Sequence, residues 1–462
     1  MTTARRIEPH AKGGIPLKRG FPIIGNIPGF RSNQHIFLRD LWQDYGDLAS
    51  MKIGPFTVLV ISHPDLVQEV LVEKNRQFLK VESDPNTPRG LKLILGDGLL
   101  TNAEHDSWLS QRRMMQPMFH RRRISAMGDK MVAATERMLT IWDDKARQGE
   151  TVEIHDAMMH VTMDIITRTM FSMDITSDAA EAGHAVTVSA KFVSARGQNP
   201  LKPPLSWPTP ANREFRRSKH ELDSLMYRII NERRASGGTK DDLLDMLLEA
   251  RDEETGEGMN DTQLRDEVVT IFAAGHETTS NALTWTLYLL TQNPAVMQRL
   301  HQELDSVLGG RTPTLDDLKD LPYTLMVLEE SMRLMPPVPF YPRISVPGAS
   351  LAGHTFSVGT PLLIAINNIH QHPDFWPDPT RFDPERFHPE HRAVTHRLAY
   401  MPFGAGPRLC IGNNFALMEG QLLLAMMAQR FDLELVPGQQ IEPEVAITMR
   451  PRYGINMRLK AR

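Results

Sequence analysis

The stretch Met401-Pro-Phe-Gly-Ala-Gly-Pro-Arg-Leu-Cys-Ile-Gly-Asn-Asn-Phe-Ala-Leu-Met-Glu-Gly-Gln421 contains Cys410, the only cysteine of the 462-residue chain. Glycines surround this cysteine, and an amphipathic run from Phe415 onward predicts a helix that begins just after it. A thiol at this place meets unpaired backbone N–H groups and the positive end of a helix dipole, which favour the thiolate. Because the thiolate is the form that binds metals, the stretch predicts a metal-ligating cysteine on a glycine-rich loop.

A lone cysteine is more often a small buried hydrophobe than a ligand. Here the spacing Phe403-x-x-Gly406-x-Arg408-x-Cys410-x-Gly412 favours the ligand, and it resembles the haem-binding loop of the cytochrome P-450 family. The loop is most similar to the branch with eukaryotic members and bacterial fatty-acid hydroxylases. The resemblance implies haem b with Cys410 as the metal ligand and with Phe403 and Arg408 beside the cofactor. A thiolate ligand favours cleavage of the O–O bond of dioxygen.

Composition limits the class of protein. A hydrophobic content of 41% and a charged content of 23% are ordinary for a soluble globular protein. The net charge of −4 argues against nucleic-acid binding, and a single cysteine fits a reducing compartment. No apolar run reaches the ~18 residues of a membrane-spanning helix, so no transmembrane anchor is expected. We therefore expect a cytoplasmic, bacterial protein, with an organelle transit peptide at Arg5 and Arg6 as the alternative.

The rest of the pattern predicts a mainly α-helical fold with small β-sheets. Residues 9–30, rich in proline and glycine, predict a non-helical start. The proline-rich stretch that begins at Gly197 cannot be helical, and its place resembles the family's mobile lid over the substrate entrance. Helices are expected over residues 36–45, 65–74, within 98–120, over 151–175, 212–236 and 241–253, and strands over 48–53, 56–62, within 351–367 and within 431–459.

Two short patterns are candidates for holding the carboxylates of a cofactor. Trp108 and Arg112 lie four apart on a predicted helix and share one face, so an indole N–H and a guanidinium could bind one carboxylate. The alternative is a core tryptophan beside a surface arginine. Their place resembles the family's propionate-binding helix, and Arg343 resembles its second propionate-binding arginine. Phe340 and Tyr341 are candidates for lining the substrate cavity.

The longest predicted helix runs over residues 261–292, capped by Asn260 or Asp261. In its middle, Gly275 and the two threonines that follow are poor helix formers, and the Thr278 hydroxyl can reach back to the carbonyl of Ala274. This predicts a local fault, with Gly275 leaving space for a ligand. The alternative is a tolerated kink, but such faults concentrate at functional sites.

The segment Ala274-Gly-x-Glu277-Thr278-Thr resembles the family's oxygen-activation motif. The resemblance implies that Ala274 and Gly275 border the cofactor and that Glu277 and Thr278 are catalytic. In that motif, the alcohol binds oxygen or a water molecule, and the acid connects this water to solvent. The pair thereby relays protons to dioxygen.

Glu330-x-x-Arg333 and the more distant Arg386 match the family's charged triad. The apolar residues around the pair predict burial, where both charges need additional partners. We interpret the triad as a scaffold for the cysteine loop and not as part of the chemistry.

The resemblance covers residues 16 to 460 and implies one haem-thiolate catalytic domain over residues 1–462, without a reductase segment. We expect a monooxygenase that inserts one atom of dioxygen into a small apolar organic substrate. A separate ferredoxin or flavoprotein reductase would supply electrons, and the basic cluster His120–Arg123 could dock it, or could be a solvated helix end. Two alternatives remain: a haem-thiolate isomerase, dehydratase or peroxygenase that does not use dioxygen, and a non-catalytic haem sensor or carrier.

Overall fold

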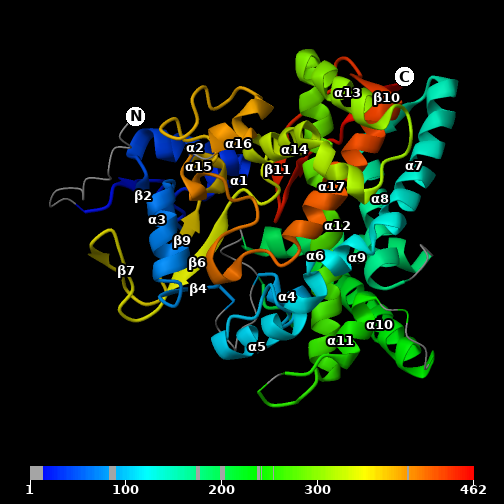
Figure 1. The fold of residues 1–462 in the computed structure, drawn as a ribbon. Coiled ribbons are helices and arrows are strands. Elements are labelled where there is room, and N and C mark those ends of the chain that lie inside the picture. The colour runs from blue at the N-terminus through cyan, green and yellow to red at the C-terminus, as the bar shows by residue number, and fades with distance from the viewer. Residues whose placement is uncertain are drawn as a thin grey trace. The chain divides into compact units, whose positions relative to one another are not determined.

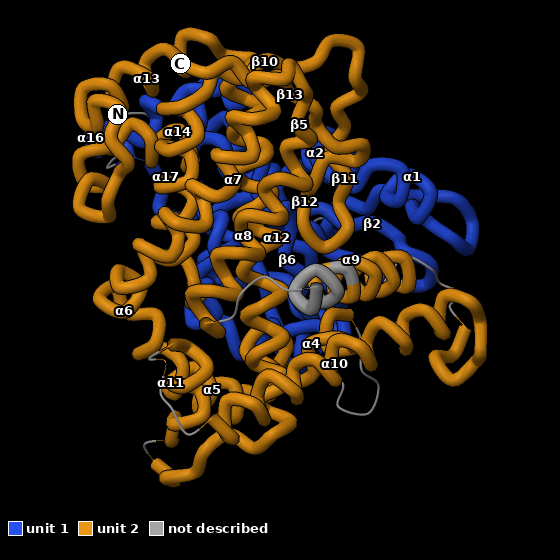
Figure 2. The backbone as a smooth tube through the Cα atoms, turned by 90° about the vertical axis from the view of Figure 1, so that its right-hand side faces the viewer, with its two compact units in different colours: residues 1–83, 330–410 blue, residues 84–329, 411–462 orange. Residues whose placement is uncertain are grey.

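The computed structural model divides into two compact units, shown in different colours in Figure 2. Unit 1 comprises residues 1–83 and 330–410, and unit 2 comprises residues 84–329 and 411–462. The residues described are 14–82, 90–172, 177–197, 203–236, 240, 242–252, 254–392 and 395–462.

Unit 1 contains a six-stranded sheet. Its elements are β1 (Leu17–Lys18), α1 (Ile27–Ser32), α2 (Gln34–Tyr45), β2 (Leu48–Ile53), β3 (Phe56–Ile61), α3 (Pro64–Val67), the π-helical turn η1 (Gln68–Glu73), β4 (Phe78–Leu79), β6 (Tyr341–Ser345), β7 (Ser350–Leu351), β8 (His354–Thr355), β9 (Pro361–Ile364), α15 (Ile366–Ile369), α16 (Pro389–Arg392) and the 3-10 turns η4 (Pro384–Phe387), η5 (Arg397–Ala399) and η6 (Gly406–Arg408). The strand order is β1-β2-β3-β9-β6-β4. β2 and β3 form the predicted hairpin, and β9 pairs with β3 in parallel.

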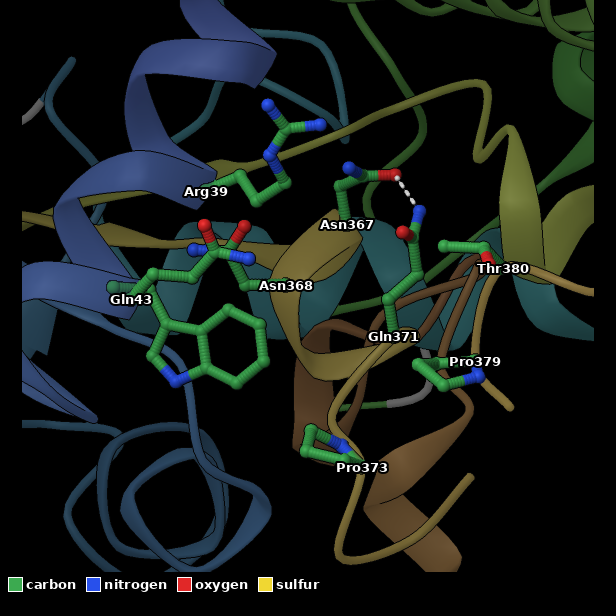
Figure 3. Close-up of a pocket in the computed structure, with 9 residues that line it drawn as sticks. Arg39, Gln43, Asn367, Asn368, Gln371, Pro373, Pro379 and Thr380 are labelled. Carbon is green, nitrogen blue, oxygen red and sulfur yellow. Dashed lines mark hydrogen bonds between the residues drawn. The ribbon is translucent and has the colours of Figure 1, made fainter. Parts of the chain in front are cut away.

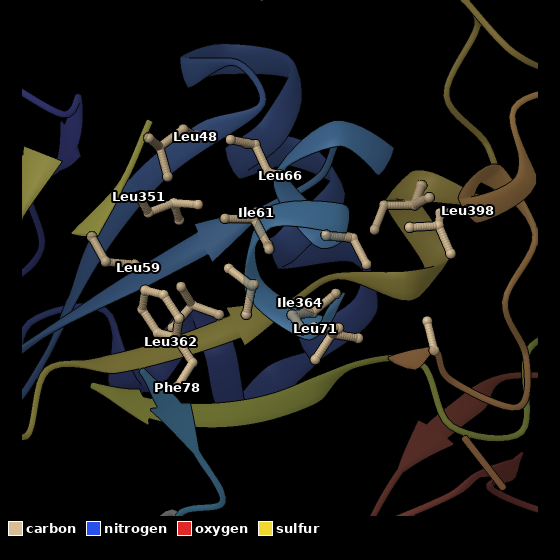
Figure 4. Packing of buried hydrophobic residues seen from close by; sticks show 14 of the residues in the cluster. Leu48, Leu59, Ile61, Leu66, Leu71, Phe78, Leu351, Leu362, Ile364 and Leu398 are labelled. Atoms are coloured by element: carbon tan, nitrogen blue, oxygen red, sulfur yellow. The ribbon is translucent and has the colours of Figure 1, made fainter. Parts of the chain in front are cut away.

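The sheet of unit 1 is covered on both faces because apolar residues occupy both sides of its central strands. In β3, Leu59 and Ile61 belong to one core cluster, whereas Val58 and Val60 belong to another, as expected when successive side chains point to opposite faces. Figure 4 shows the first cluster, to which Leu398 also belongs. The same cluster includes Ala405, so the start of the cysteine loop is fixed to this core.

Unit 2 is mainly helical. Its elements are α4 (Lys92–Leu95), α5 (His105–Met115), the 3-10 turn η2 (Gln116–Phe119), α6 (Arg121–Ser125), α7 (Gly128–Gln148), β5 (Thr151–Glu153), α8 (Ile154–Met170), α9 (Ser177–Gly197), α10 (Pro210–Ser236), α11 (Leu243–Glu249), α12 (Asp261–Gln292), α13 (Pro294–Leu308), the 3-10 turn η3 (Leu315–Asp320), α17 (Asn413–Arg430), β10 (Phe431–Leu435), β11 (Pro443–Val445), β12 (Met449–Pro451) and β13 (Asn456–Ala461). α14 (Pro322–Leu334) begins in unit 2 and ends in unit 1.

The long helix α12 is the centre of unit 2. It begins at the predicted cap, where the Asn260 side chain accepts a hydrogen bond of 2.9 Å from the Gln263 N–H. Helices α8 and α17 pack against it (Figure 1). The contact with α8 is close, because a Cβ atom on Gly275 would lie 2.5 Å from Cδ1 of Ile166. None of the described helices combines the length and apolar character that crossing a bilayer requires.

Several predicted elements are confirmed, including α2, the β2–β3 hairpin, α10, α12 and the helix after Cys410. Other predictions were wrong in part. Residues 151–153 form strand β5, paired with β13, so the predicted helix begins only at Ile154. Helix α1 interrupts the start expected to be non-helical, since Pro28 fits the first turn of a helix.

Two further helices differ from the sequence prediction. Helix α9 was missed, because its small and β-branched residues leave no single apolar stripe. Helix α11 covers only Leu243–Glu249 of the range predicted as helical. The predicted non-helical stretch is confirmed over residues 203–209, but Gly197 at its start is the last residue of α9; residues 198–202 lie outside the described residues.

Candidate functional site

The loop before Cys410 has a shape that only glycine permits at two positions. The Cys410 N–H donates a hydrogen bond of 2.9 Å to the Phe403 carbonyl, which closes the loop. Gly404 and Gly406 have φ values of +78° and +67°, and a Cβ atom on Gly406 would lie 2.0 Å from the Leu71 carbonyl oxygen. The loop presents the exposed Cys410 side chain just before α17. The helix that the sequence predicts after Cys410 is thereby confirmed.

Tyr341, which the sequence suggested as a cavity residue, supports this loop. The Tyr341 hydroxyl donates a hydrogen bond of 3.1 Å to the Pro402 carbonyl, and its ring packs against the core of unit 1. Burial, together with the negative charge of the nearby Cys410 thiolate, raises the pKa of Tyr341. The phenol therefore stays neutral and acts as a hydrogen-bond donor under the loop.

A group of cations lies near the cysteine loop in unit 1. Arg343 is buried, and its Nη1 donates a hydrogen bond of 2.7 Å to the Pro342 carbonyl. Burial lowers the pKa of Lys80 to about 7, and the positive charges of Arg343 and Arg408 add to this effect, while Glu82 opposes it. Burial also lowers the pKa of Arg343. Three cations against one carboxylate form a donor set suited to a ligand with carboxylate groups.

Lys80 was not predicted from the sequence as a site residue. This lysine follows the short strand β4 in Phe78-Leu-Lys-Val, where a lysine between apolar residues is a weak signal. Only the pairing of β4 with β6 brings it toward Arg343, which lies on β6. Lys80 and Arg343 are 263 positions apart in the sequence, so their spacing does not show that they lie close together. The pairing of β4 with β6, with Leu79 opposite Ile344, does show it.

Trp108 and Arg112 lie close together on α5 of unit 2, as their spacing predicts. The Arg112 guanidinium carbon lies 5.9 Å from the centre of the Trp108 ring. Glu104 fixes the start of the helix by accepting hydrogen bonds from the N–H groups of Asp106 and Ser107. Trp108 is buried and Arg112 is half-buried, so the two donors are held on one face of a capped helix.

The predicted hydrogen bond within α12 is confirmed. Thr278 Oγ1 donates to the Ala274 carbonyl over 2.7 Å, and Ala274 itself is exposed although most of α12 is buried. The predicted fault does not interrupt the helix, which is continuous over Asp261–Gln292. A side chain at Gly275 would meet Ile166 of α8, so close packing between the two helices is one reason for this glycine that the sequence did not reveal.

Glu277 is tied to a segment that the sequence analysis did not connect with it. Thr448 Oγ1 donates a hydrogen bond of 2.7 Å to Glu277 Oε1, and Asn281 Nδ2 donates to Thr448 Oγ1 over 3.1 Å. Trp285 Nε1 donates to the Met449 carbonyl over 3.0 Å. Glu277, Asn281 and Trp285 lie four apart, so one face of α12 binds the turn before β12.

Two acids at the start of α12 hold the loop after α4. The Glu267 carboxylate accepts a hydrogen bond of 2.9 Å from the Leu99 N–H, and Asp266 accepts one of 2.7 Å from the Asp97 N–H. Gly98 packs directly on α12, because a Cβ atom there would lie 2.1 Å from Thr270 Oγ1. Burial raises the pKa of Glu267 to about 8, so its carboxyl group favours the neutral form.

The charged triad is confirmed within unit 1. Glu330 and Arg333 are both fully buried and joined by hydrogen bonds of 2.6 and 2.8 Å, and Arg386 Nε lies 3.5 Å from Glu330 Oε1. Arg333 Nη1 also donates to the carbonyl of His370, whose Nε2 accepts from the Met401 N–H over 2.9 Å. The triad therefore connects to the start of the cysteine loop, as the sequence analysis proposed.

A cluster of Asp47, His63 and His372 in unit 1 has the residue types of a metal site. His63 Nδ1 accepts a hydrogen bond from the Asp65 N–H at 3.1 Å, and His372 Nδ1 accepts one from the Asp374 N–H at 3.2 Å. In the neutral rings the proton must then lie on Nε2, which is the nitrogen that faces Asp47 in His372. The cluster is satisfied as a hydrogen-bond network and does not offer free imidazole lone pairs to a metal.

A pocket of about 410 Å³ in unit 1 contains none of the predicted site residues (Figure 3). Two of its amide side chains already have hydrogen-bond partners within the protein. Gln371 Nε2 donates to Asn367 Oδ1, and Asn368 Nδ2 donates to the Leu38 carbonyl. The lining residues are Arg39, Trp42, Gln43, Asn367, Asn368, Gln371, Pro373, Pro379 and Thr380. The predicted site residues therefore lie outside this pocket.

Comparisons with known proteins show which family the chain resembles over most of its length. The family model described as Cytochrome P450 matches residues 15–456. Cyclooctat-9-en-7-ol 5-monooxygenase of Streptomyces melanosporofaciens is 35% identical over 90% of this chain and 89% of its own length. Pentalenene oxygenase of Streptomyces avermitilis is 31% identical over 96% of each chain. The crystal structure of the cytochrome P450DA heme domain superposes with a TM-score of 0.88 and 28% identity, covering 97% of this chain and 98% of that one.

Proposed function

Because this chain belongs to the cytochrome P450 family, we propose that it inserts one atom of dioxygen into an apolar organic substrate with electrons from a separate donor protein. The family and its relatives named as oxygenases make the protein a monooxygenase, an oxidoreductase that incorporates molecular oxygen. The observation that carries the finer proposal is the adjacent acid and alcohol on α12: Thr278 donates to the Ala274 carbonyl, and Glu277 accepts a hydrogen bond from Thr448. An isomerase or dehydratase needs no such proton relay.

We assign the thiolate ligand of haem b to Cys410. It is the only cysteine, its thiol is exposed, and its loop is fixed to the core of unit 1. When bound, the haem supplies the activation of dioxygen. Arg343, Arg408 and Lys80 of unit 1 are the proposed partners of its carboxylates.

The proposed cofactor-binding residues of unit 2 come from α5 and α12. Trp108 and Arg112 offer an indole N–H and a guanidinium for a carboxylate. Ala274 is exposed on α12 and is proposed to border the cofactor together with Gly275, and Phe403 is proposed to do so from the cysteine loop. Together, these two hydrogen-bond donors and the apolar residues fit a largely apolar cofactor that carries carboxylate groups.

The two relay side chains have distinct proposed roles. Since the Thr278 proton is engaged by the Ala274 carbonyl, the Thr278 oxygen presents its lone pairs and can orient the O–H group of a water molecule. Glu277 Oε1 accepts a hydrogen bond from the Thr448 hydroxyl. The other carboxylate oxygen is then the one that takes up a proton and passes it on. Thr278 thereby places a proton donor, and Glu277 resupplies it.

For the substrate, we propose an apolar cyclic hydrocarbon or a simple alcohol of one. The names of two relatives contain the compounds cyclooctat-9-en-7-ol and pentalenene, and both relatives align with most of this chain. The donor is proposed to be a ferredoxin or a flavoprotein reductase.

Stoichiometry tests this proposal. The holoprotein is supplied with a ferredoxin, its reductase and a substrate that shifts the haem spin state, and dioxygen, reductant and product are counted. A monooxygenase consumes dioxygen and reductant in proportion to product. Product without dioxygen uptake would favour the isomerase or dehydratase, and product driven by peroxide alone would favour a peroxygenase. Failure to oxidise any spin-shifting ligand would favour a sensor or carrier.

A further inference from the structure

Four large apolar side chains are exposed on two neighbouring turns of unit 1. Ile23 is 92% exposed, Phe21 63%, Phe56 59% and Ile24 41%. We call these four residues the apolar tip. Single exposed apolar residues are common, but a contiguous group of large ones marks an interaction site.

The two turns that carry the apolar tip are joined by the backbone. The turn over residues 21–25 is closed by reciprocal hydrogen bonds of 2.9 Å between Phe21 and Gly25. The Gly54 N–H, in the turn between β2 and β3, donates to the Ile24 carbonyl over 3.2 Å. A Cβ atom on Gly25 would lie 2.3 Å from the Lys52 carbonyl oxygen, so the contact is tight. Backbone hydrogen bonds of the folded unit 1 therefore hold the two turns of the apolar tip in place.

Ile23 also has an unfavourable backbone conformation. Its φ is +68°, a region that β-branched residues strongly avoid and that glycine or asparagine would occupy at lower cost. The side chain gains almost no burial within the protein in return. Strain of this kind is typical of positions kept for function. The geometry thus points to burial of Ile23 against something outside the chain.

The surrounding sequence is positively charged. Residues 14–39 contain Lys18, Arg19, Arg31 and Arg39 and no acidic residue. Lys18 pairs with Asp44 at 3.3 Å and Arg39 with Asp40 at 3.1 Å. Arg19 and Arg31 are exposed, and neither has an acidic partner among the residues described. Apolar residues at protruding turns, flanked by cations, match a bilayer with anionic headgroups.

We propose that the apolar tip docks unit 1 peripherally on an anionic lipid bilayer. Phe21, Ile23, Ile24 and Phe56 would enter the boundary between headgroups and acyl chains, and Arg19 and Arg31 would bind lipid phosphates. A bilayer accepts protruding side chains in any arrangement, whereas a protein partner needs a complementary groove for each. The proposal does not depend on the chemistry assigned to the cysteine loop.

Co-sedimentation of the holoprotein with vesicles tests the proposal. We expect binding to phosphatidylcholine vesicles that contain phosphatidylglycerol, weaker binding to pure phosphatidylcholine, and loss of the difference at high salt. Ile23→Gly should weaken vesicle binding about tenfold, because one buried side chain is lost. The same variant should keep or raise the melting temperature, since it relieves the strained φ, and this separates lost binding from misfolding.

Two further variants sharpen the result. Arg19→Gln with Arg31→Gln should remove the preference for anionic vesicles. Val358→Ser is the matched control, because Val358 is 66% exposed in unit 1 on a different turn, and it should bind as the wild type does. Absence of wild-type binding, or equal binding by Ile23→Gly, would overturn the proposal. A dimer in solution that Ile23→Gly dissociates, without vesicle binding, would also overturn it and would assign the apolar tip to a second copy of the chain.

Discussion

The hydroxyl of Thr448 donates a hydrogen bond of 2.7 Å to the carboxylate of Glu277, although 171 positions separate the two residues. Both belong to unit 2, and Asn281 completes the chain by donating to Thr448. The carboxylate that we assign to proton delivery is therefore held by a turn from the C-terminal part of the chain. Its orientation depends on a residue outside the motif that identified it.

Removal of this hydrogen bond should impair proton delivery. Thr448→Val keeps the shape of the side chain but leaves Glu277 without its donor, and a hydrogen bond to a charged group contributes about 1.5–3 kcal/mol. We expect product per dioxygen consumed to fall on the order of tenfold, with more hydrogen peroxide released. Thr448→Ser keeps the hydroxyl and should restore most of the product. If valine and serine behaved alike, Thr448 would have only a packing role.

Haem affinity should depend on the protonation of Lys80. Burial and two arginines lower its pKa to about 7 in the protein without haem, and a carboxylate bound beside it favours the charged form. Haem affinity should therefore fall as the pH rises through about 7, by on the order of tenfold, and binding above that pH should take up a proton. Calorimetry in buffers of different ionisation enthalpy counts this proton.

Lys80→Met should abolish the proton uptake and flatten the pH dependence. Lys52→Met is the control, because Lys52 lies in the same unit and its ammonium binds the Thr57 hydroxyl at 2.8 Å. A wild-type affinity independent of pH between about 6 and 8 would contradict the placement of Lys80 beside a cofactor carboxylate.

Glu267 should make the protein less stable at higher pH. Its folded-state pKa is raised to about 8, whereas an unfolded glutamate titrates near ~4.3, so between these values the folded state binds more protons. Its stabilisation is complete below about pH 4 and is lost as the pH rises toward about 8. Glu267→Gln should raise the free energy of unfolding near pH 7.5 by on the order of 2–4 kcal/mol. Denaturant unfolding of both proteins near pH 7.5 and pH 5 measures this, and a gain that did not shrink at the lower pH would contradict the assignment.

Loss of Arg333 should destabilise unit 1 strongly. Arg333→Leu leaves the fully buried Glu330 without its main partner, and breaking such a pair costs about 3–5 kcal/mol. Arg217→Leu is the control, since the Arg217–Glu221 pair is exposed on α10 and should contribute little. Thermal unfolding of the holoproteins compares them. Similar small effects for both variants would show that the triad does not support the cysteine loop.

The sequence predicted those parts of the site that depend on local spacing. Cys410 before a helix, Trp108 and Arg112 on one face, and Thr278 bonded to Ala274 are all separated by a few residues. Contacts between segments that are distant in the sequence could not be predicted in this way. Thr448 reaches Glu277, and Lys80 comes near Arg343, only through the pairing of distant segments. Gly275 shows the same limit, because the side chain that explains it belongs to α8.

In the fold, too, elements with local sequence signals were predicted, whereas elements that depend on pairing between distant segments were not. A helix with a cap and a proline just after its end, such as α12 between Asn260 and Pro294, was found with correct ends. Strand β5 was read as part of a helix, because three residues carry no period and only their pairing with β13 makes them a strand. The division into two units, with its boundary after Cys410, has no marker in the composition of the loop.

The central claim, that Cys410 is the thiolate ligand of haem, is tested most directly by the absorption spectrum of the reduced, carbon monoxide-bound protein. The account predicts a strongly red-shifted Soret band in the wild type and its absence in Cys410→Ala. A folded, haem-loaded wild type without that band, or a Cys410→Ala variant that keeps it, would contradict the claim.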